Sequence, residues 1–491
     1  MIDWNKCLSE QREHESNVNN TTYSQDNRQA KDTIHSKEEN QEYSPNYDYQ
    51  CSTRYDYRNA FESDFGRVVF STAARRMHDK TQVFPLTNGD SVHTRLTHSM
   101  EVMSVATSLG INLCRDPHFV ETYGQTQAME LERKIPTILK TAAFVHDIGN
   151  PPFGHCGEAI IQDFFTHQGA RLMEQIPAEQ RLDFTQFDGN AQGFRILTKM
   201  PYLNDLHGLN LTYSTLAAYL KYPNTGSKDK HGDVAVHKHG VFNSEQQILN
   251  HIAEHCHLYR ADGSIMRHPL AFLVEAADTI CYRIMDLEDG LSQQLITIEQ
   301  TFDYLADRLH CTPNDIANLL HMKHTHTTPD YTYERMVVDL RVALMNYFVR
   351  VAQHTYITHL GEIGVGTFGK ELLEDDPLCR ALGDYEVEHI FRTQEIARAE
   401  LTGERVLTGI LEKTIELLID KRDWHIRAII SPSMSRLAEA EYRAAYPQQT
   451  TSQPIDFLHI DLYHQLRLIV DWVAGMTDKY ALETYHLLYG I

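Results

Sequence analysis

The 491-residue chain has a small share of basic residues and contains no long apolar run. Lys and Arg number 45 against 67 Asp and Glu, which gives a formal net charge of −22. A balance this acidic argues against a protein that binds nucleic acid or an anionic membrane over its whole surface. No stretch approaches the roughly 18 uninterrupted apolar residues of a membrane span. The first residues lack a basic region followed by an apolar one, so we expect no secretory signal and a cytoplasmic location.

Two kinds of motif are also missing. The eight cysteines form no CxxC pair and follow no regular spacing, so we expect reduced thiols rather than a disulfide framework. The sequence contains neither GxxxxGKS/T nor GxGxxG. Their absence excludes a P-loop or Rossmann nucleotide site by motif.

The polar N-terminal part of the chain differs from the rest. Residues 13–53 are rich in Asn, Gln, Ser, Glu and Lys, and such a segment cannot bury enough apolar surface to offset its chain entropy. We expect residues 1–55 to be largely disordered, except that Ile2, Trp4 and Leu8 can dock as a short separate piece. We divide the remainder into a core over 56–300 and a helical C-terminal region over 301–491, which packs on the core and contributes to oligomer contacts.

The pattern of apolar residues is overwhelmingly helical. Spacing near 3.6 residues and the proline and turn signals predict helices at 68–77, 98–113, 135–146, 158–168, 190–197, 212–222, 244–257, 269–287, 298–309, 333–359, 387–401, 405–418 and 462–488. Strand signals are few. A short hairpin arm is expected at 238–242 and a surface loop at 223–239. The sequence therefore predicts an all-α, bundle-like fold.

The helix predicted at 135–146 is almost continuously apolar, yet it ends in His146 and Asp147. An ionisable pair at a buried position is costly unless it is paired or binds a metal. His98 and Asp278 are two further ionisable residues on largely apolar helices, and each of the four, taken singly, could be a hydrogen-bonded core residue. Together they offer two imidazoles and two carboxylates. That donor set suits Mn²⁺ or Fe²⁺, tolerates Mg²⁺ and lacks the thiolates of a structural zinc site.

His155 and Glu158 form a second candidate pair. They are three residues apart, so on a helix they share one face. The carboxylate can then orient the imidazole and raise its pKa, as in a proton-transfer pair. The alternative is a structural pair in the first turn of a helix.

Two long motifs carry a resemblance to a known family. They are RRMHDKTQVF at 75–84 and HDIGNPPFGHCGE at 146–158, and they resemble the HD-domain deoxynucleoside triphosphate triphosphohydrolases, the dGTPase family. The resemblance runs from about residue 61 to 222 and again through 286, with weaker patches at 400–412 and 475–480. It implies an all-α HD-domain helical bundle with long excursions and few short strands, whose catalytic core is the 56–300 region. It also implies metal-dependent hydrolysis of deoxynucleoside triphosphates, dGTP among them, to the deoxynucleoside and tripolyphosphate.

The resemblance also implies roles for individual residues. His98, His146, Asp147 and Asp278 become the ligands of a divalent ion, Mn²⁺ or Mg²⁺ with Fe²⁺ as a third candidate, and His155 and Glu158 become the catalytic pair. The remaining residues are substrate contacts: Gln82 and Val83 beside the sugar, Lys221 with Tyr222 and Lys238 on the phosphates, and Tyr282 and Asp286 on the sugar.

Several of these substrate contacts have alternatives. Tyr282 and Asp286 follow Asp278 by one and two helical turns on the same face, where a ring can crowd the 2′ position and a carboxylate can accept from the 3′-OH. Tyr282 could instead be a core aromatic, Asp286 could make a polar contact within residues 286–289, and the lysines could be solvated. Arg95, one turn before His98, could hold a phosphate or buttress Glu101.

The resemblance implies homo-oligomers, often hexamers, and in some members binding of single-stranded DNA or activation by a second nucleotide. No membrane partner is expected. Two other functions stay open: a different HD-domain nucleotide phosphohydrolase, and a nucleotide-responsive protein that binds single-stranded nucleic acid. The His155/Glu158 and Gln82–Val83 motifs argue against the first, and the complete ligand set argues against the second. The histidine-rich run at 321–326 has no carboxylate partners and is predicted to be a surface loop.

Overall fold

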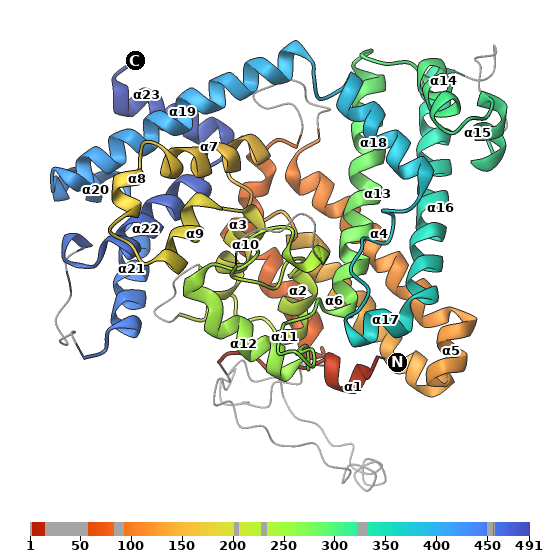
Figure 1. Ribbon diagram of the computed structural model, residues 1–491, viewed down its shortest axis with the longest axis horizontal. Helices are drawn as coiled ribbons and strands as arrows, with labels where there is room; N and C mark the ends of the chain where they lie inside the picture. The colour runs from red at the N-terminus through yellow and green to blue at the C-terminus, as the bar shows by residue number, and fades with distance from the viewer. Residues whose placement is uncertain are drawn as a thin grey trace, which may run out of the picture.

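The computed structural model describes residues 2–14, 57–82, 93–200, 206–226, 233–322, 332–448, 455 and 457–491 (Figure 1). Every regular element in these ranges is a helix, and extended residues pair only in isolated bridges such as Arg12 with Thr212. The predicted all-α fold is therefore confirmed. Within the same ranges, no helix combines the length and apolar composition needed to cross a bilayer.

The helices of the first part of the chain are α1 (Trp4–Cys7), α2 (Ala60–Val69), α3 (Thr72–Arg76), α4 (Arg95–Arg115), α5 (Pro117–Tyr123), α6 (Gln125–Val145), α7 (Gly154–Thr166), α8 (Ala170–Met173), α9 (Ala178–Thr185), α10 (Gly189–Thr198), α11 (Tyr213–Tyr219), α12 (Gln246–His255) and α13 (Pro269–Ser292). Short 3₁₀ turns lie at Met77–Asp79, Val234–Val236 and Asn243–Glu245.

The second part of the chain forms α14 (Ile298–Arg308), α15 (Pro313–Leu319), α16 (Tyr333–Thr358), α17 (Leu360–Val365), α18 (Pro377–His389), α19 (Gln394–Ile419), α20 (Asp423–Ile429), α21 (Pro432–Ala445), α22 (Leu462–Ala474) and α23 (Asp478–Tyr489), with a 3₁₀ turn at Phe457–His459. In Figure 1, α13 and α16 stand side by side and α19 runs along the top of the molecule.

Two hydrophobic clusters make up the core. The larger one is built around α4, α6, α13 and α16, and the smaller one joins α7 and α9 to α19 and α22. The segment 146–153 connects α6 of the first cluster to α7 of the second. This turn therefore lies where the two clusters meet, and it contains His146 and Asp147.

Residues 2–14 pack against the larger cluster. Trp4 is 1 % exposed and lies against the rings of Phe119 and Tyr123. Arg12 places its guanidinium 2.6 Å from a carboxylate oxygen of Asp64 on α2. The docking piece expected around Trp4 is thus present, whereas the rest of the predicted disordered segment, residues 15–55, lies outside the described residues.

Four element predictions were wrong. The helices expected at 387–401 and 405–418 do not match, because residues 390–393 separate α18 from α19 and α19 continues through 401–405 without a break. The helix expected at 68–77 is interrupted at Ser71, whose hydroxyl caps the new helix α3 by accepting from Ala74 N. The long helix expected at 462–488 is divided into α22 and α23, because the Thr477 side chain caps a new start. The expected hairpin arm at 238–242 contains no strand, since Val241 N donates to the loop carbonyl of Asn224 instead.

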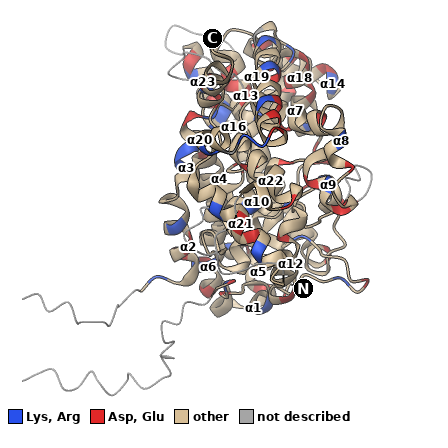
Figure 2. Cartoon of the chain, turned by 90° about the vertical axis from the view of Figure 1, so that its left-hand side faces the viewer, with Lys and Arg blue, Asp and Glu red and all other residues tan. Residues whose placement is uncertain are grey.

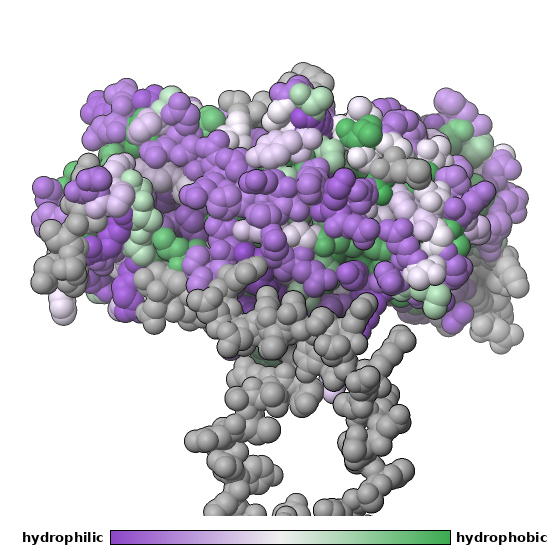
Figure 3. Space-filling view, turned by 90° about the horizontal axis from the view of Figure 1, so that it is seen from below, coloured by the Kyte–Doolittle hydropathy of each residue, from purple (hydrophilic) through white to green (hydrophobic). Residues whose placement is uncertain are grey.

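Charged residues of both signs are intermingled on the side of the molecule that Figure 2 shows. The face in Figure 3 is largely hydrophilic, with apolar residues in separate small groups. This distribution fits a protein whose specific chemistry is confined to an interior site.

Candidate active site

His98 on α4 and Asp278 on α13 converge with His146 and Asp147, which lie in the turn after α6. Nε2 of His98 (α4) and Nε2 of His146 both lie 3.2 Å from Oδ1 of Asp278 (α13), and His146 Nε2 lies 3.6 Å from Oδ1 of Asp147. One donor atom from each of His98, His146 and Asp147 falls within 4.8 Å of the others. The structure therefore brings together the four residues that the sequence analysis proposed as ligands.

The tautomers and surroundings fit a metal site. Nδ1 of His146 lies 2.7 Å from the carbonyl of Ala143, so Nδ1 donates to that carbonyl and Nε2 faces the carboxylates. That Nε2 atom is buried and makes no hydrogen bond. Two imidazoles and two carboxylates with this orientation are suitable donors for a borderline divalent cation.

Three polar side chains surround the carboxylates. Arg95 donates to Asp147 Oδ2 at 2.5 Å, and the Asn150 amide donates to Asp147 Oδ1 at 2.8 Å. Lys221 donates to Asp278 Oδ2 at 2.5 Å. Arg95 thus lies on a carboxylate of the cluster, which sequence reasoning did not foresee; its contact with a phosphate stays a prediction.

The charges of this cluster compensate one another. Burial opposes ionisation of Asp147, but His146 and Arg95 outweigh it and hold the pKa of that carboxyl well below its usual value. Burial likewise opposes the charge on Asp278, and here Lys221 and His146 lower the pKa. Both carboxyl groups are therefore ionised at neutral pH, the form that binds a cation.

His155 and Glu158 face each other in the first turn of α7. His155 Nδ1 lies 2.8 Å from Glu158 Oε2, while Glu158 Oε1 accepts from the backbone N–H of Gly189 at 2.7 Å. A Cβ at Gly189 would come within 2.7 Å of that same oxygen, so only glycine allows this approach. The carboxylate is 6 % exposed and fixed from both sides. It is therefore placed to orient the imidazole, whose side chain is 77 % exposed.

The pair is electrostatically coupled. The hydrogen bond and charge of Glu158 raise the pKa of His155 above its ordinary value. Burial works against the charge of Glu158, but His155 outweighs it and lowers the pKa of Glu158 to about 2. Nδ1 of His155 is committed to Glu158, so Nε2 is the nitrogen available for proton transfer.

A cavity of about 530 Å³ extends from the cluster to the His155–Glu158 pair. It is lined by Gln82, Arg95, Asp147, Asn150, Phe153, Gly154, His155, Cys156, Asp278, Thr279, Tyr282, Phe391, Ile396, Ala399 and Glu400. Six of the residues predicted from sequence therefore share one cavity: Gln82, Arg95, Asp147, His155, Asp278 and Tyr282.

Other predicted substrate residues lie outside this lining. Lys221 contacts Asp278, and Lys238 has its ammonium 3.8 Å from Asp188 Oδ2. Asp286 is 1 % exposed, and burial together with the nearby Glu386 raises the pKa of its carboxyl well above the usual value. Tyr222 is also absent from the lining. Val83 lies outside the described residues.

The C-terminal half contributes residues that sequence reasoning did not select. Phe391 follows α18, and its ring stacks on Tyr282 with centroids 6.0 Å apart and an interplanar angle of 18°. Glu400 on α19 adds a carboxylate to the cavity wall. The only sequence feature that pointed to Glu400 was its place at the start of the segment 400–412, where the resemblance to the family is weak. No feature of the local sequence pointed to Phe391.

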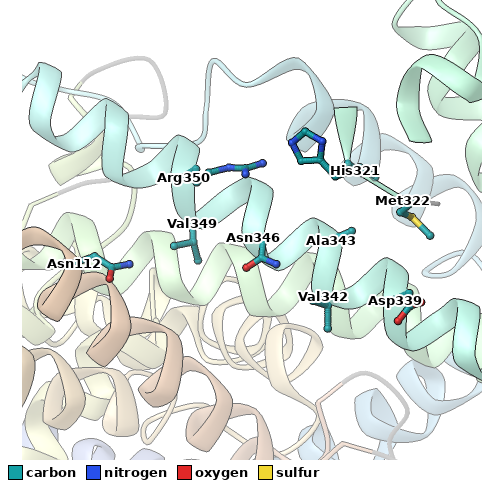
Figure 4. A pocket seen from close by; sticks show the side chains of 10 residues that line it. Asn112, His321, Met322, Asp339, Val342, Ala343, Asn346, Val349 and Arg350 are labelled. Carbon is teal, nitrogen blue, oxygen red and sulfur yellow. The ribbon is translucent and has the colours of Figure 1, made fainter. Parts of the chain in front are cut away.

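A second cavity of similar size lies along α16 (Figure 4). Its lining includes Asn112, His321, Asn346 and Arg350 and contains none of the predicted site residues. His321 is exposed at the end of a turn, as expected for a surface loop, and residues 323–326 lie outside the described ranges. The predicted chemistry therefore belongs to the first cavity.

Comparison with known proteins agrees with this geometry. The HD domain family matches residues 95–184, and the family described as a phosphohydrolase-associated domain matches residues 377–487. The second match covers the helices that bring Glu400 to the cavity. The chain thus pairs the HD motif with a C-terminal region found in phosphohydrolases.

Named relatives match along most of the chain. A deoxyguanosinetriphosphate triphosphohydrolase-like protein of Listeria monocytogenes is 32 % identical, with the alignment covering 89 % of this chain and 95 % of the relative. Deoxyguanosinetriphosphate triphosphohydrolases of Cronobacter sakazakii and Salmonella enteritidis are each 31 % identical, over 88 % and 89 % of this chain and 94 % and 95 % of their own lengths. Together with a cavity lined by residues of the cluster and by His155, these matches show that the chain belongs to the deoxyguanosinetriphosphate triphosphohydrolase family of HD-domain hydrolases.

Proposed function

We propose that this protein hydrolyses deoxynucleoside triphosphates, dGTP among them, to the deoxynucleoside and tripolyphosphate. The observation that carries the proposal is the shared cavity, whose lining includes Asp147 and Asp278 of the four-residue cluster, His155 of the second pair, and the stacked rings of Tyr282 and Phe391. The names of the relatives support the same activity.

His98, His146, Asp147 and Asp278 would hold the divalent cation on which the HD domain depends. Their nitrogen and oxygen donors fit Mn²⁺ or Mg²⁺, with Fe²⁺ as a third candidate. Such an ion, when bound, lowers the pKa of water and polarises a phosphoryl oxygen. Arg95 and Asn150 keep the Asp147 carboxylate oriented through hydrogen bonds of 2.5 and 2.8 Å.

His155 would move the proton that the reaction requires. Hydrolysis joins a water oxygen to the α-phosphorus and breaks the bond between that phosphorus and O5′, which leaves with a proton. Glu158 fixes the ring through Nδ1, so Nε2 can accept a proton from water or give one to O5′. A raised pKa keeps the imidazolium available at higher pH than in a free histidine.

The rest of the substrate is assigned to the surrounding side chains. Arg95, Lys221 and Lys238 supply the positive charge for the phosphates, with Tyr222 beside Lys221. Gln82, Val83, Tyr282 and Asp286 are proposed to contact the sugar. Asp286 would need a rearrangement to reach it, because its carboxyl is 1 % exposed.

The base would lie against the C-terminal side of the cavity. Phe391 offers a ring face for stacking, and Glu400 offers a carboxylate. Guanine presents N1–H and N2–H donors side by side, and a carboxylate can accept from both. Adenine lacks that donor pair. Glu400 therefore favours dGTP as one of the substrates.

The same proposal extends to the protein as a whole. We infer an HD-domain catalytic core over 56–300 and a C-terminal region over 301–491 that contributes contacts between copies. The exposed apolar side chains of Trp424, Leu487 and Ile491, which are 80, 76 and 76 % exposed, are candidate contacts of a homo-oligomer. The cytoplasmic location stays a prediction. Nucleotide activation and single-stranded DNA binding stay predictions.

A product assay tests the activity. The purified protein is incubated with each of the four dNTPs and either Mn²⁺ or Mg²⁺, and the products are separated so that tripolyphosphate is resolved from pyrophosphate and phosphate. We expect equal amounts of deoxynucleoside and tripolyphosphate. Release of pyrophosphate would indicate a different HD phosphohydrolase. Nucleotide binding without any hydrolysis would indicate a nucleotide-responsive binding protein.

A further inference from the structure

The turn between the last two helices is connected to the active site by a buried aspartate. Asp478 begins α23 and is 3 % exposed. Its Oδ2 accepts from the backbone N–H of Thr81 at 3.1 Å and from the Thr81 hydroxyl at 2.6 Å. Its Oδ1 accepts from the backbone N–H of Phe153 at 2.9 Å. One carboxylate thus joins two segments that are far apart in sequence.

Lys80 makes a second connection beside the first. Its ammonium, buried to 3 % exposure, donates to the carbonyl of Asn150 at 2.5 Å and to the carbonyl of Ala474, the last residue of α22, at 2.9 Å. Its own carbonyl accepts from Arg95 N at 2.9 Å, where α4 starts. The end of α22, the start of α23 and the start of α4 are therefore held to the same two segments.

Both segments carry residues of the cavity. Thr81 precedes Gln82, which lines the cavity. Phe153 precedes Gly154 and His155, and its left-handed backbone with φ 63° is unfavourable for a residue with a side chain. The Asp478 hydrogen bond to its N–H stabilises that conformation at the point where α7 begins. Asn150 donates its amide to Asp147 Oδ1, so its position affects the proposed metal ligand.

A second buried aspartate, Asp64, provides a control, because it makes similar hydrogen bonds at a place that does not contact the cavity. Asp64 on α2 is 0 % exposed and accepts from the N–H and the hydroxyl of Thr212 at 3.0 and 2.7 Å. Neither residue lines the cavity. Asp64 also pairs with Arg12 and accepts from the Thr215 hydroxyl. The two aspartates thus share a buried bond to a threonine N–H and hydroxyl, and only Asp478 makes these bonds to segments of the site.

We propose that Asp478 is a positioning residue of the active site, which acts through Thr81 on Gln82 and through Phe153 on His155, with Lys80 as its partner. This inference rests on the proposed function. It assigns the sequence patch 475–480 a role in the reaction although none of its residues lines the cavity. The C-terminal region would thereby set the geometry of a site whose proposed ligands and catalytic pair all come from the first 300 residues.

The first experiment compares Asp478→Asn with Asp64→Asn in the full-length protein. Each substitution replaces one accepting oxygen with a donating amide that faces N–H or O–H groups. Activity is measured per folded molecule, well below the melting temperature of both variants. We expect Asp478→Asn to lower kcat by as much as about 10²-fold, the effect of a displacement near 1 Å, and to reduce the preference for dGTP over GTP. Asp64→Asn should lose stability but keep wild-type kcat and sugar preference.

A milder pair keeps the test valid where Asp478→Asn fails to fold. Thr81→Val removes the hydroxyl hydrogen bond to Asp478 with little change of shape, and Thr81→Ser retains it. We expect Thr81→Val to lower kcat and the sugar preference and Thr81→Ser to restore both. Wild-type kcat and sugar preference in Asp478→Asn and Thr81→Val would overturn the proposal.

A readout independent of turnover separates this inference from the proposed activity. Amide hydrogen exchange is followed in peptides covering 147–157, together with the affinity of the protein for Mn²⁺. Positioning by Asp478 predicts faster exchange and altered Mn²⁺ affinity in Asp478→Asn and no such change in Asp64→Asn. If the wild type hydrolyses no dNTP, the proposed function fails while these changes still support the connection. Unchanged exchange and affinity would overturn the connection itself.

Discussion

The imidazole of His155 and the carboxylate of Glu158 are held one helical turn apart, with Nδ1 and Oε2 separated by 2.8 Å. The second oxygen of Glu158 is bound by the Gly189 N–H, so the carboxylate cannot rotate freely. This double attachment fixes the direction of the imidazole in the cavity. It distinguishes the pair from a simple helix-end contact, in which the carboxylate would remain solvated.

His155→Ala is expected to lower kcat by a factor on the order of 10² to 10⁴, the usual contribution of a positioned acid or base. Metal content and dNTP binding should remain, because His155 is not one of the four proposed ligands. These three quantities are measured by turnover at saturating dNTP for kcat, by metal analysis for metal content and by nucleotide titration for dNTP binding. His359→Ala is a matched control, because His359 and Glu362 form a similar pair at 3.1 Å far from the cavity. Loss of the metal in His155→Ala would make that residue a ligand instead.

The pH dependence of kcat is expected to change in Glu158→Gln. Glu158 raises the pKa of His155, so its loss should move the His155 limb of the pH profile to lower pH. If His155 acts as an acid, that limb falls with rising pH; if it acts as a base, the limb rises. Glu362→Gln should leave the limb in place, and an unmoved limb in Glu158→Gln would remove His155 from the profile.

The raised pKa of His155 also predicts how the free energy of unfolding depends on pH. Because His155 gains its proton more readily in the folded protein, its contribution to the free energy of unfolding is fully present below the unfolded pKa. The contribution is lost as pH rises through the raised folded pKa. The difference in melting temperature between wild type and Glu158→Gln should therefore shrink between mildly acidic and alkaline pH. A difference that grows over that interval would contradict the assigned pKa direction.

The main helices could be predicted because their apolar spacing is regular. The helix expected at 333–359 corresponds to α16, and the one expected at 269–287 lies within α13. Element ends were predicted less well where a single side chain decides them. The hydroxyls of Ser71 and Thr477 cap new helices inside segments whose apolar spacing predicts one continuous helix. A capping hydrogen bond contributes about 1 kcal/mol, which apolar periodicity does not reveal.

Part of the candidate site could also be predicted from the pattern of apolar residues along the helices. Ionisable residues at the end of an apolar helix stand out, which identified His146 and Asp147. The approach of Phe391 to Tyr282 depends on how α18 packs against α13, and local sequence does not contain that information. Asp286 shows what helical spacing leaves out, although its contact with the sugar stays a prediction. Helical spacing placed it on the face of Asp278, but packing against the region of Glu386 buried it.

Removal of a proposed ligand should abolish both metal binding and turnover. Asp147→Ala and His146→Ala each delete one of four donors, and metal analysis with Mn²⁺ titration measures the loss. Asn150→Ala removes only the amide that orients Asp147 and should weaken metal affinity by roughly 10- to 100-fold. His268→Asn serves as a control, because His268 is buried outside the cluster and bonds to the Cys7 carbonyl. Wild-type metal content in Asp147→Ala would contradict the ligand assignment.

Discrimination between deoxyribose and ribose is expected to depend on Tyr282. Its ring is held against Phe391 and, with Gln82, borders the cavity next to Asp278. A 2′-hydroxyl buried there without a partner would cost about 1–3 kcal/mol, which corresponds to roughly 5- to 150-fold in kcat/KM. Wild-type protein should therefore hydrolyse dGTP in preference to GTP, and Tyr282→Ala should lose most of that preference.

The control for this prediction is Tyr282→Phe, which keeps the ring and should keep the preference. Asp286→Ala is informative beside it, because a contact with the 3′-OH predicts weaker binding of dGTP than of its 2′,3′-dideoxy analogue relative to wild type. The kcat/KM values for dGTP, GTP and ddGTP, repeated with dTTP, ribothymidine triphosphate and ddTTP, give all of these ratios. Equal hydrolysis of GTP and dGTP by the wild type would remove the sugar assignment of Tyr282. It would favour instead a broader HD phosphohydrolase that uses the same metal cluster and the same His155–Glu158 pair.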